Sequence, residues 1–313
     1  MDNLTHSLVG LMMARVSGRR AAMMVVAANL PDIDVVAMLG SQVTYLEYHR
    51  GLTHSLAAAP LLALIPMLLF RRRDWASYSG CLAGVLSHLL LDWTNIYGVR
   101  LLMPFSSRWM HLDITDVADP WILLALLLAV AAPALAGLVS SEIGAKTSSG
   151  AKFGWAWAAL AFLMLYEGGR NVAHQRALSM VGARLWNGRP ALRISAMPNR
   201  WSPFAWRGII EGEGYAINAD VDLPNDVDSG RIDYSSPPDQ AVLKTRPFEV
   251  FARFNQVPFW KSEKLADGTT EVRLIDLRFG TPDEPGFMAT AIVDESGAVK
   301  ESQFGFGRLP RGK

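Results

Sequence analysis

Long runs of apolar residues are the feature that most constrains this chain, and almost all of them lie within residues 1–169. Half of all residues are hydrophobic and 19% are charged, which is apolar for a soluble protein. Because about 20 mostly apolar residues cross the hydrocarbon core of a bilayer, the sequence predicts a membrane α-helical domain of about 4–6 helices over residues 1–169. Residues 170–313 are more polar and predict a second domain.

Six apolar segments are candidates for the helices of the first domain. They are Leu4 to Ala14, Ala21 to Leu39, Ser55 to Phe70, Ala76 to Leu91, Pro120 to Val139 and Phe153 to Tyr166. The last two are the clearest spans, and Ser55 to Phe70 with Ala76 to Leu91 predicts a helical hairpin. Pro31, Asp32 and Asp34 are expected to end or break the helix that begins at Ala21.

Basic residues in short loops predict the orientation, because such loops stay on the cytoplasmic side. Three loops carry them: Arg15, Arg19 and Arg20; Arg71 to Arg73; and Lys146 with Lys152. With these loops inside, Asp32 to His54, His88 to Asp119 and everything after Gly169 fall on the extracytoplasmic side. The net charge of +1 shows no basic excess, so nucleic acid is not an expected partner.

Histidine and aspartate residues gather at the ends of the apolar segments. The set comprises His6, His49, His54, His88, His111, Asp32, Asp34, Asp92, Asp113, Asp116 and Asp119. Ionisable groups at membrane depth are costly unless they are paired, hydrated or bound to a metal. The only cysteine is Cys81, so a cysteine-based zinc site is excluded and nitrogen and oxygen ligands are expected.

The most specific local pattern is His88 with Asp92, because residues i and i+4 of a helix point in the same direction and can chelate one metal ion. A hydrogen bond that ties two helices together would use the same spacing. His49 and His54 flank the turn at Gly51, where a histidine that merely caps a helix is the alternative.

Asp32 and Asp34 follow an apolar helix at i, i+2 spacing, which lets one carboxylate bind metal while the other orients a ligand. An Asx-turn at the helix end is the alternative, although carboxylates oppose the negative end of the helix dipole. His6 alone could be an interfacial histidine. Together these residues predict a site for zinc, with manganese or iron as other ions suited to such ligands and two ions preferred.

Four motifs in this order carry a resemblance to a known family. They are Leu4-Thr5-His6-Ser7, Asn29-Leu30-Pro31-Asp32-Ile33-Asp34, His49-Arg50-Gly51-Leu52-Thr53-His54-Ser55 and His88-Leu89-Leu90-Leu91-Asp92. The chain resembles the YdjM-like family of inner-membrane-associated metal-dependent hydrolases over roughly residues 1–140, including the run that ends at Asp119-Pro120. The resemblance implies a multi-pass protein of the bacterial inner (cytoplasmic) membrane. It assigns metal-ligand roles to His6, Asp32, Asp34, His49, His54, His88, Asp92 and Asp119.

A more distant resemblance is to zinc-dependent phospholipase C, whose ligands run in a similar order. That likeness matches His6, Asp34, His54, His88 and Asp92. This chain lacks the following HxxxE pair and the N-terminal tryptophan ligand of that fold, so two metal ions are expected rather than three. The catalytic residues expected are Asp32, Asp34, His54 and His88, with Asp32 as general base if Asp34 is a ligand.

The second domain is predicted to be a small antiparallel β-rich domain. A helix over Asn171 to Leu185 should lead into it, and period-2 patterns over Gly214 to Val221, Phe248 to Phe254 and Glu271 to Phe279 predict strands. Met197 to Trp206 is rich in aromatic residues and proline. It is either a lid over the site or a packing and interfacial anchor.

Two classes of function remain in view. The first is hydrolysis of a phosphoester or related ester in a lipid or envelope metabolite by metal-activated water, with membrane lipid as a partner. The alternative is a non-enzymatic membrane protein with a structural or sensing metal, or a metal-ion transporter. A transporter should place its ligands near mid-membrane, whereas these lie at helix ends. The substrate and the oligomeric state do not follow from the sequence.

Overall fold

The computed structural model describes residues 1–143 and 150–307. The chain divides into two compact units: the first contains Met1–Asp34, Arg50–His174 and Pro198–Pro203, and the second contains Val35–His49, Gln175–Met197 and the chain from Phe204 onward. The predicted boundary at residues 169 and 170 stays a prediction. Lys146, which was used for the orientation, lies outside the described residues.

The first unit is helical, as predicted. Its helices are α1 (Asn3–Ser17), α2 (Ala21–Asn29), α4 (Ala59–Leu62), α5 (Leu64–Leu69), α6 (Trp75–Thr94), α7 (Pro120–Glu142) and most of α8 (Gly150–Gly182). Aspartate side chains cap three of them: Asp2, Asp74 and Asp119 accept hydrogen bonds from backbone N–H groups in the first turns of α1, α6 and α7. Such caps satisfy donors that have no partner within the helix.

The α-helical geometry ends next to Pro31, Asp32 and Asp34, as predicted. These three residues are called the Pro-Asp motif below. Helix α2 stops at Asn29, and Leu30–Leu39 continues as a 3₁₀ helix. The prediction of one helix over Ser55 to Phe70 is wrong, because this segment contains two short helices, α4 and α5, and follows a 3₁₀ turn at Leu52–His54. Pro66 has no N–H to donate to Leu62, which accounts for the break between α4 and α5.

Small residues allow α1, α2 and α6 to approach closely. A Cβ atom added to Gly10 of α1 would lie 2.8 Å from the carbonyl oxygen of Met24 in α2, and one added to Gly84 of α6 would lie 3.1 Å from Cβ of Ala27. Close contact through glycine and alanine is typical of helices packed in a membrane. The contact at Gly84 holds the C-terminal end of α2, which precedes the Pro-Asp motif, next to α6.

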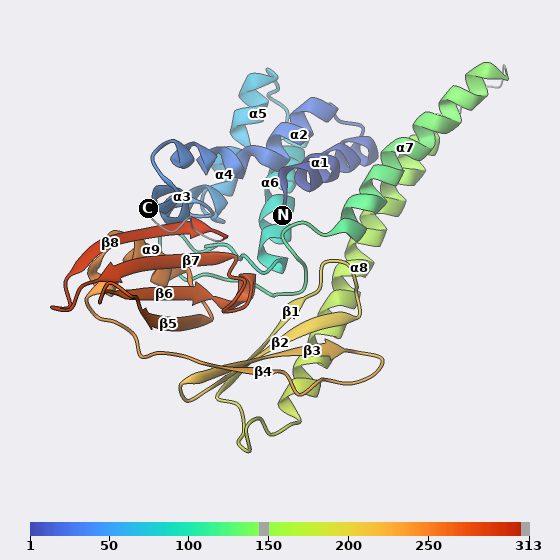
Figure 1. Cartoon of the computed structure of the whole chain (residues 1–313). Helices are drawn as coiled ribbons and strands as arrows, with labels where there is room; N and C mark the ends of the chain where they lie inside the picture. The colour runs from blue at the N-terminus through green and yellow to red at the C-terminus, as the bar shows by residue number, and fades with distance from the viewer. Residues whose placement is uncertain (144–149, 308–313) are drawn as a thin grey trace. The chain divides into compact units, whose positions relative to one another are not determined.

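Helices α7 and α8 lie side by side (Figure 1) and share an apolar core with α1 that includes Ile122, Leu126, Ala156 and Leu163. The predicted helix over Asn171 to Leu185 is the continuation of α8, which ends at Gly182. By length and apolarity, two helical segments of the described chain suffice to cross a membrane: Ala21–Leu39 and Pro120–Glu142. A third is added if the broken segment from Gln42 to Leu69 counts as one span.

The second unit contains two antiparallel four-stranded sheets with strand orders β1-β2-β3-β4 and β5-β6-β7-β8. The strands are β1 (Arg193–Pro198), β2 (Ala205–Gly212), β3 (Tyr215–Asp222), β4 (Arg231–Tyr234), β5 (Pro258–Lys264), β6 (Thr270–Asp276), β7 (Phe287–Val293) and β8 (Val299–Phe306). Gly214, with φ +74°, sits in the two-residue turn that joins β2 to β3. The predicted strand at Gly214 to Val221 is confirmed in β3, and the one at Glu271 to Phe279 is confirmed in β6 as far as Asp276, after which Leu277–Phe279 forms a 3₁₀ helix.

The prediction of a strand over Phe248 to Phe254 is wrong, because this segment is helix α9 (Arg246–Phe254). Pro247 occupies its first turn, where proline is well tolerated, and the buried Phe248, Phe251 and Phe254 recur at helical spacing. Helix α9 packs on β7 and β8, and α3 (Gln42–Tyr48) packs on α9 and β8. A segment from the first fifth of the sequence thus belongs to the C-terminal fold.

A half-buried arginine joins the two sheets. Arg207 of β2 donates to Asn218 Oδ1 and to the carbonyl oxygens of Gly280, Leu277 and Arg278 at 2.7–3.0 Å. Burial lowers the pKa of Arg207 to about 10. These four bonds connect β2 and β3 to the turn that follows β6.

Candidate metal site

Four ionisable side chains of the first unit converge on one point: Asp32, His54, His88 and Asp92. His54 Nε2 lies 3.2 Å from His88 Nε2, 3.3 Å from Asp32 Oδ1 and 3.5 Å from Asp92 Oδ2. His88 Nε2 lies 3.3 Å from Asp92 Oδ2 and 3.6 Å from Asp32 Oδ1. Three of the side chains are fully buried, and that of Asp32 is 12% exposed.

Local structure explains why each side chain reaches this point. His88 and Asp92 are one turn apart in α6, so they extend from the same face. Asp32 comes from the 3₁₀ segment after α2, and His54 from the 3₁₀ turn at Leu52–His54. The close contact of α2 with α6 at Gly84 brings the Pro-Asp motif next to His88.

Neighbouring groups orient both histidines so that Nε2 faces the cluster. His88 Nδ1 lies 2.7 Å from the carbonyl oxygen of Ala28, which can only accept, so the proton is on Nδ1. His54 Nδ1 faces Asp34 Oδ2 at 3.2 Å and Thr53 Oγ1 at 3.1 Å. Histidines that bind metal usually donate their other N–H to a carbonyl or carboxylate in this way.

Asp34 occupies the position of an orienting residue. Its Oδ2 accepts hydrogen bonds from Arg50 N at 3.0 Å and Thr53 Oγ1 at 2.9 Å, besides facing His54. One oxygen of Asp34 therefore fixes the turn that carries His54. Its predicted role as a direct ligand stays a prediction.

His6 borders the cluster from α1. Its ring stacks on that of His88 with centroids 3.7 Å apart, and its Nε2 lies 3.5 Å from Asp92 Oδ1. Within the described residues, the buried His6 Nδ1 and Asp92 Oδ2 have no hydrogen-bond partner. Buried polar atoms without partners are rare and call for an explanation such as an ion.

Arg50 is a residue of the site that our sequence reasoning did not identify. Its Nη2 lies 2.9 Å from Asp92 Oδ1, and its Nη1 donates to Asn95 Oδ1 and to the carbonyl oxygen of Gly98. The side chain is buried and lies over the ring of Tyr97. The sequence feature that could have identified Arg50 is its position inside the motif His49 to Ser55. The amino group of Met1 also contacts Asp92 Oδ1.

Two predicted ligands have other contacts. Asp119 caps α7 through Trp121 N and Ile122 N and accepts a hydrogen bond from Tyr166 at 3.0 Å. Burial raises the pKa of Asp119, and Asp119 is not part of the four-residue group. His49 belongs to the second unit, where its ring stacks on Tyr45 at 4.4 Å. Its ligand role stays a prediction, as does the lid role of the segment Met197 to Trp206.

That segment contains contacts of a packing element. Arg200 forms an ion pair with Asp116, Trp121 donates its indole N–H to the carbonyl oxygen of Trp201, and Arg170 donates to that of Pro203. All of these residues belong to the first unit. The contacts favour an anchor over a free lid.

The four-residue group fits a divalent ion. Donors about 2.0–2.2 Å from an ion at the corners of a tetrahedron lie about 3.3–3.6 Å from one another. The five separations given above run from 3.2 to 3.6 Å. Two imidazole nitrogens and two carboxylate oxygens suit zinc, and also manganese or iron. The group supplies donors for one ion, and a second remains an expectation.

Fold and site together define a membrane-associated helical protein with a buried His/Asp cluster able to hold a metal ion. Residues 1–177 match the family described as YdjM inner membrane protein, and the chain belongs to that family. Residues 239–308 match the YfhP C-terminal alpha/beta plait domain, which corresponds to α9 and the second sheet.

A curated relative is the uncharacterized protein YfhP of Bacillus subtilis (strain 168). It is 32% identical over 149 residues, which cover 42% of this chain and 46% of the relative. The match therefore spans about half of the relative's length. No solved structure matches the chain, so the likeness to phospholipase C remains a resemblance of motifs.

Proposed function

We propose that this protein is a membrane-bound metal-dependent hydrolase that acts on a phosphoester or related ester of a lipid or envelope metabolite. The observation that supports it most is the tetrahedral spacing of Asp32, His54, His88 and Asp92. A divalent ion held by these residues would supply Lewis acidity and lower the pKa of a water molecule.

The residues around the group have separate tasks in this proposal. Asp34 holds His54 in its orientation. Asp32 is the only one of the four with an exposed side-chain surface, so a substrate or water would reach the ion beside this carboxylate. Its role as general base depends on Asp34 being a ligand and stays a prediction. Arg50 offsets the negative charge of Asp92 and places a guanidinium, the group best suited to phosphate, at the edge of the site.

The burial of His54, His88 and Asp92 favours a second candidate, a structural or sensing metal. A closed four-ligand shell is typical of structural zinc, whereas catalytic zinc keeps an open position. The two candidates differ in what happens when a ligand is lost. Loss of a structural ion lowers the stability of the fold, because its binding energy is part of the folding energy.

The test uses the purified full chain in detergent. Metal content is measured by mass spectrometry, and hydrolysis of aryl phosphoesters and phospholipids is measured with and without chelator. For a hydrolase, His88→Ala should lose metal and turnover with little change in melting temperature. His111→Ala, which alters a histidine that pairs with Asp113, should retain both. Chelator-insensitive or absent hydrolysis, with a melting temperature that collapses in His88→Ala, would favour the structural metal.

The proposed location is the bacterial inner membrane, with the site and the β-rich unit on the extracytoplasmic side. The basic loops support this orientation. Cys81 is buried and is the only cysteine, so Cys81→Ala gives a background for Glu263→Cys on the exposed part of β5. An impermeant maleimide should label this cysteine in spheroplasts with an intact inner membrane. Labelling only after lysis would reverse the orientation.

A further inference from the structure

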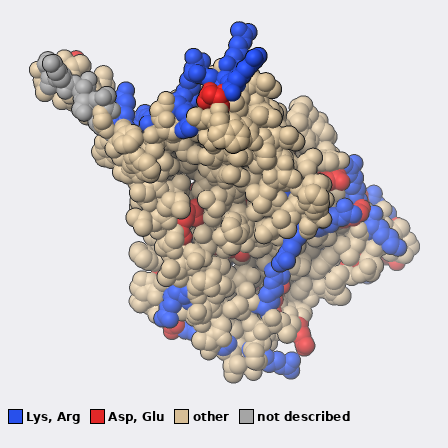
Figure 2. Space-filling model, turned by 180° about the vertical axis from the view of Figure 1, so that it is seen from behind, with Lys and Arg blue, Asp and Glu red and all other residues tan. Residues whose placement is uncertain are grey.

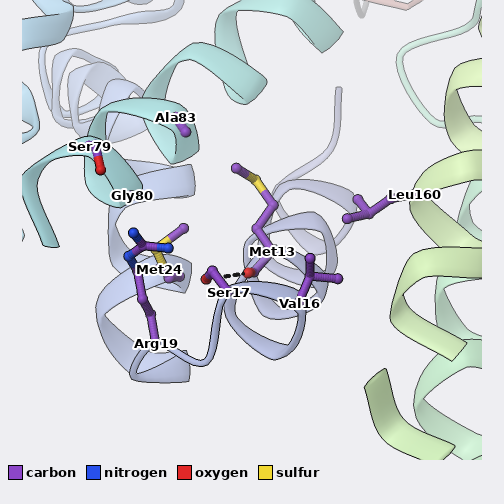
Figure 3. A pocket seen from close by; sticks show the side chains of 9 residues that line it. All are labelled: Met13, Val16, Ser17, Arg19, Met24, Ser79, Gly80, Ala83 and Leu160. Carbon is purple, nitrogen blue, oxygen red and sulfur yellow. Dashed lines mark hydrogen bonds between the residues drawn. The ribbon is translucent and has the colours of Figure 1, made fainter. Parts of the chain in front are cut away.

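The first unit contains a pocket of about 380 Å³ between α1, α2, α6 and α8. Met13 and Val16 of α1 and Leu160 of α8 form apolar walls, and Met24 lies beside Arg19 (Figure 3). Its volume is in the range of small-molecule sites, which are mostly apolar with a few polar groups. The pocket lies about 16 Å from the His/Asp cluster, the rise of α1 between His6 and Ser17.

A single guanidinium provides the charge of the pocket. The Nε of Arg19 donates to the carbonyl oxygen of Ala76 at 2.8 Å, which fixes the side chain against α6. Gly80 makes room for it, because a Cβ atom there would lie 2.6 Å from Cδ and Nε of Arg19. Across residues 1–143 and 150–307, Arg19 forms no ion pair with a carboxylate. The positive charge in the pocket is therefore not offset by an acidic side chain.

The surroundings of the pocket have the composition of a membrane interface. Arg71 to Arg73 precede the start of α6, and Trp75 on its first turn is 79% exposed. The nearby α5 exposes Leu68 and Leu69. Basic residues and tryptophan next to exposed apolar side chains mark the headgroup region of a bilayer. Figure 2 shows basic side chains in groups with broad uncharged areas between them.

We propose that this pocket binds one anionic phospholipid of the surrounding bilayer. Its acyl chain lies along Met13, Val16 and Leu160, and its phosphate pairs with Arg19. Charge complementarity supports this occupant, because a zwitterionic lipid would bring a second cation to a site that already holds a guanidinium. The lipid site is independent of the hydrolase proposal, since it shares no residue with the His/Asp cluster.

The experiment is native mass spectrometry of the delipidated full chain, titrated with dioleoyl phosphatidylglycerol or dioleoyl phosphatidylcholine. The parent should bind one phosphatidylglycerol about fivefold more tightly than phosphatidylcholine, equivalent to about 1 kcal/mol for one arginine. Arg19→Gln and Gly80→Ala should remove this preference. Arg108→Gln, which alters an exposed arginine outside the pocket, should retain it.

A further variant keeps the test decisive if Arg19→Gln fails to fold. Ala83→Phe fills the apolar part of the pocket without touching the Arg19 bond to Ala76, and it should weaken binding of both lipids at an unchanged melting temperature. Equal affinity of the parent for both lipids would overturn the proposal. So would an unchanged preference in Arg19→Gln, or full displacement of the lipid by soluble glycerol phosphate, which would make a free phosphate ester the ligand.

Discussion

Both units bury charged side chains, but they satisfy them differently. In the β-rich unit, Arg207 has four hydrogen-bond acceptors, and Arg278 pairs with Asp276 at 2.6 Å. In the helical unit, Asp32, His54, His88 and Asp92 point toward one another, and Asp92 Oδ2 has no hydrogen-bond partner among the described residues. In the first arrangement each guanidinium faces acceptors of the protein itself, whereas the second gathers donor atoms that could hold a cation.

The largest effect should come from removing a donor of the cluster. His88→Ala should weaken zinc binding by more than about 100-fold, because even residues that only orient a ligand contribute 10–100-fold. Affinity is measured by competition with a zinc chelator of known affinity. His111→Ala should bind zinc as tightly as the parent. Equal zinc affinity in the parent, His88→Ala and His111→Ala would contradict the expectation that the His/Asp cluster of the helical unit binds the ion.

The β-rich unit should respond in stability and not in metal content. Arg207→Leu removes the donor of four part-buried hydrogen bonds and should destabilise this unit by about 3 kcal/mol. Circular dichroism of the β signal during thermal melting measures the change. Arg231→Leu alters an exposed arginine that pairs with Asp283 and should shift stability by less than about 0.5 kcal/mol. A loss of bound metal in Arg207→Leu would contradict the expectation that Arg207 affects only the stability of the β-rich unit.

A smaller effect is expected at Asp34. If it orients His54, Asp34→Asn should weaken zinc binding by about 10–100-fold, while the protein still binds one equivalent at saturating zinc. Thr53→Ala, which removes a hydroxyl bound to the same carboxylate oxygen, should weaken binding less. A loss in Asp34→Asn as large as that in His88→Ala would show that Asp34 is itself a ligand.

Local sequence predicts some features of the fold and of the candidate site, and others depend on packing. The i, i+4 spacing of His88 and Asp92 follows from helix geometry alone, and the break at Pro31 follows from proline chemistry. The proximity of Asp32 to His54 depends on how α2 packs against α6. That packing cannot be predicted from the local sequence. Arg50 was missed because a basic residue next to a histidine motif has many explanations until its partner Asp92 is known.

The wrong strand at α9 has a local cause. Phe248, Val250 and Phe254 fit a period of two, while Phe248, Phe251 and Phe254 fit a helix, and both patterns are present in one short segment. Pro247 and the Glu249–Arg253 pair at i, i+4 spacing favour the helix. The packing of α9 on β7 and β8 also favours the helix, and this tertiary contact cannot be predicted from the sequence.

The membership of Val35–His49 in the second unit has a consequence for dissecting this protein. This segment leaves the helical unit after Asp34 and returns at Arg50, so the chain enters the C-terminal fold twice. A protein truncated after His174 would expose the face of α3 that α9 and β8 cover, and the isolated C-terminal part would lack α3. Neither family match therefore marks a piece that can be expressed alone, and insertions or deletions between Asp34 and Arg50 would disturb both halves at once.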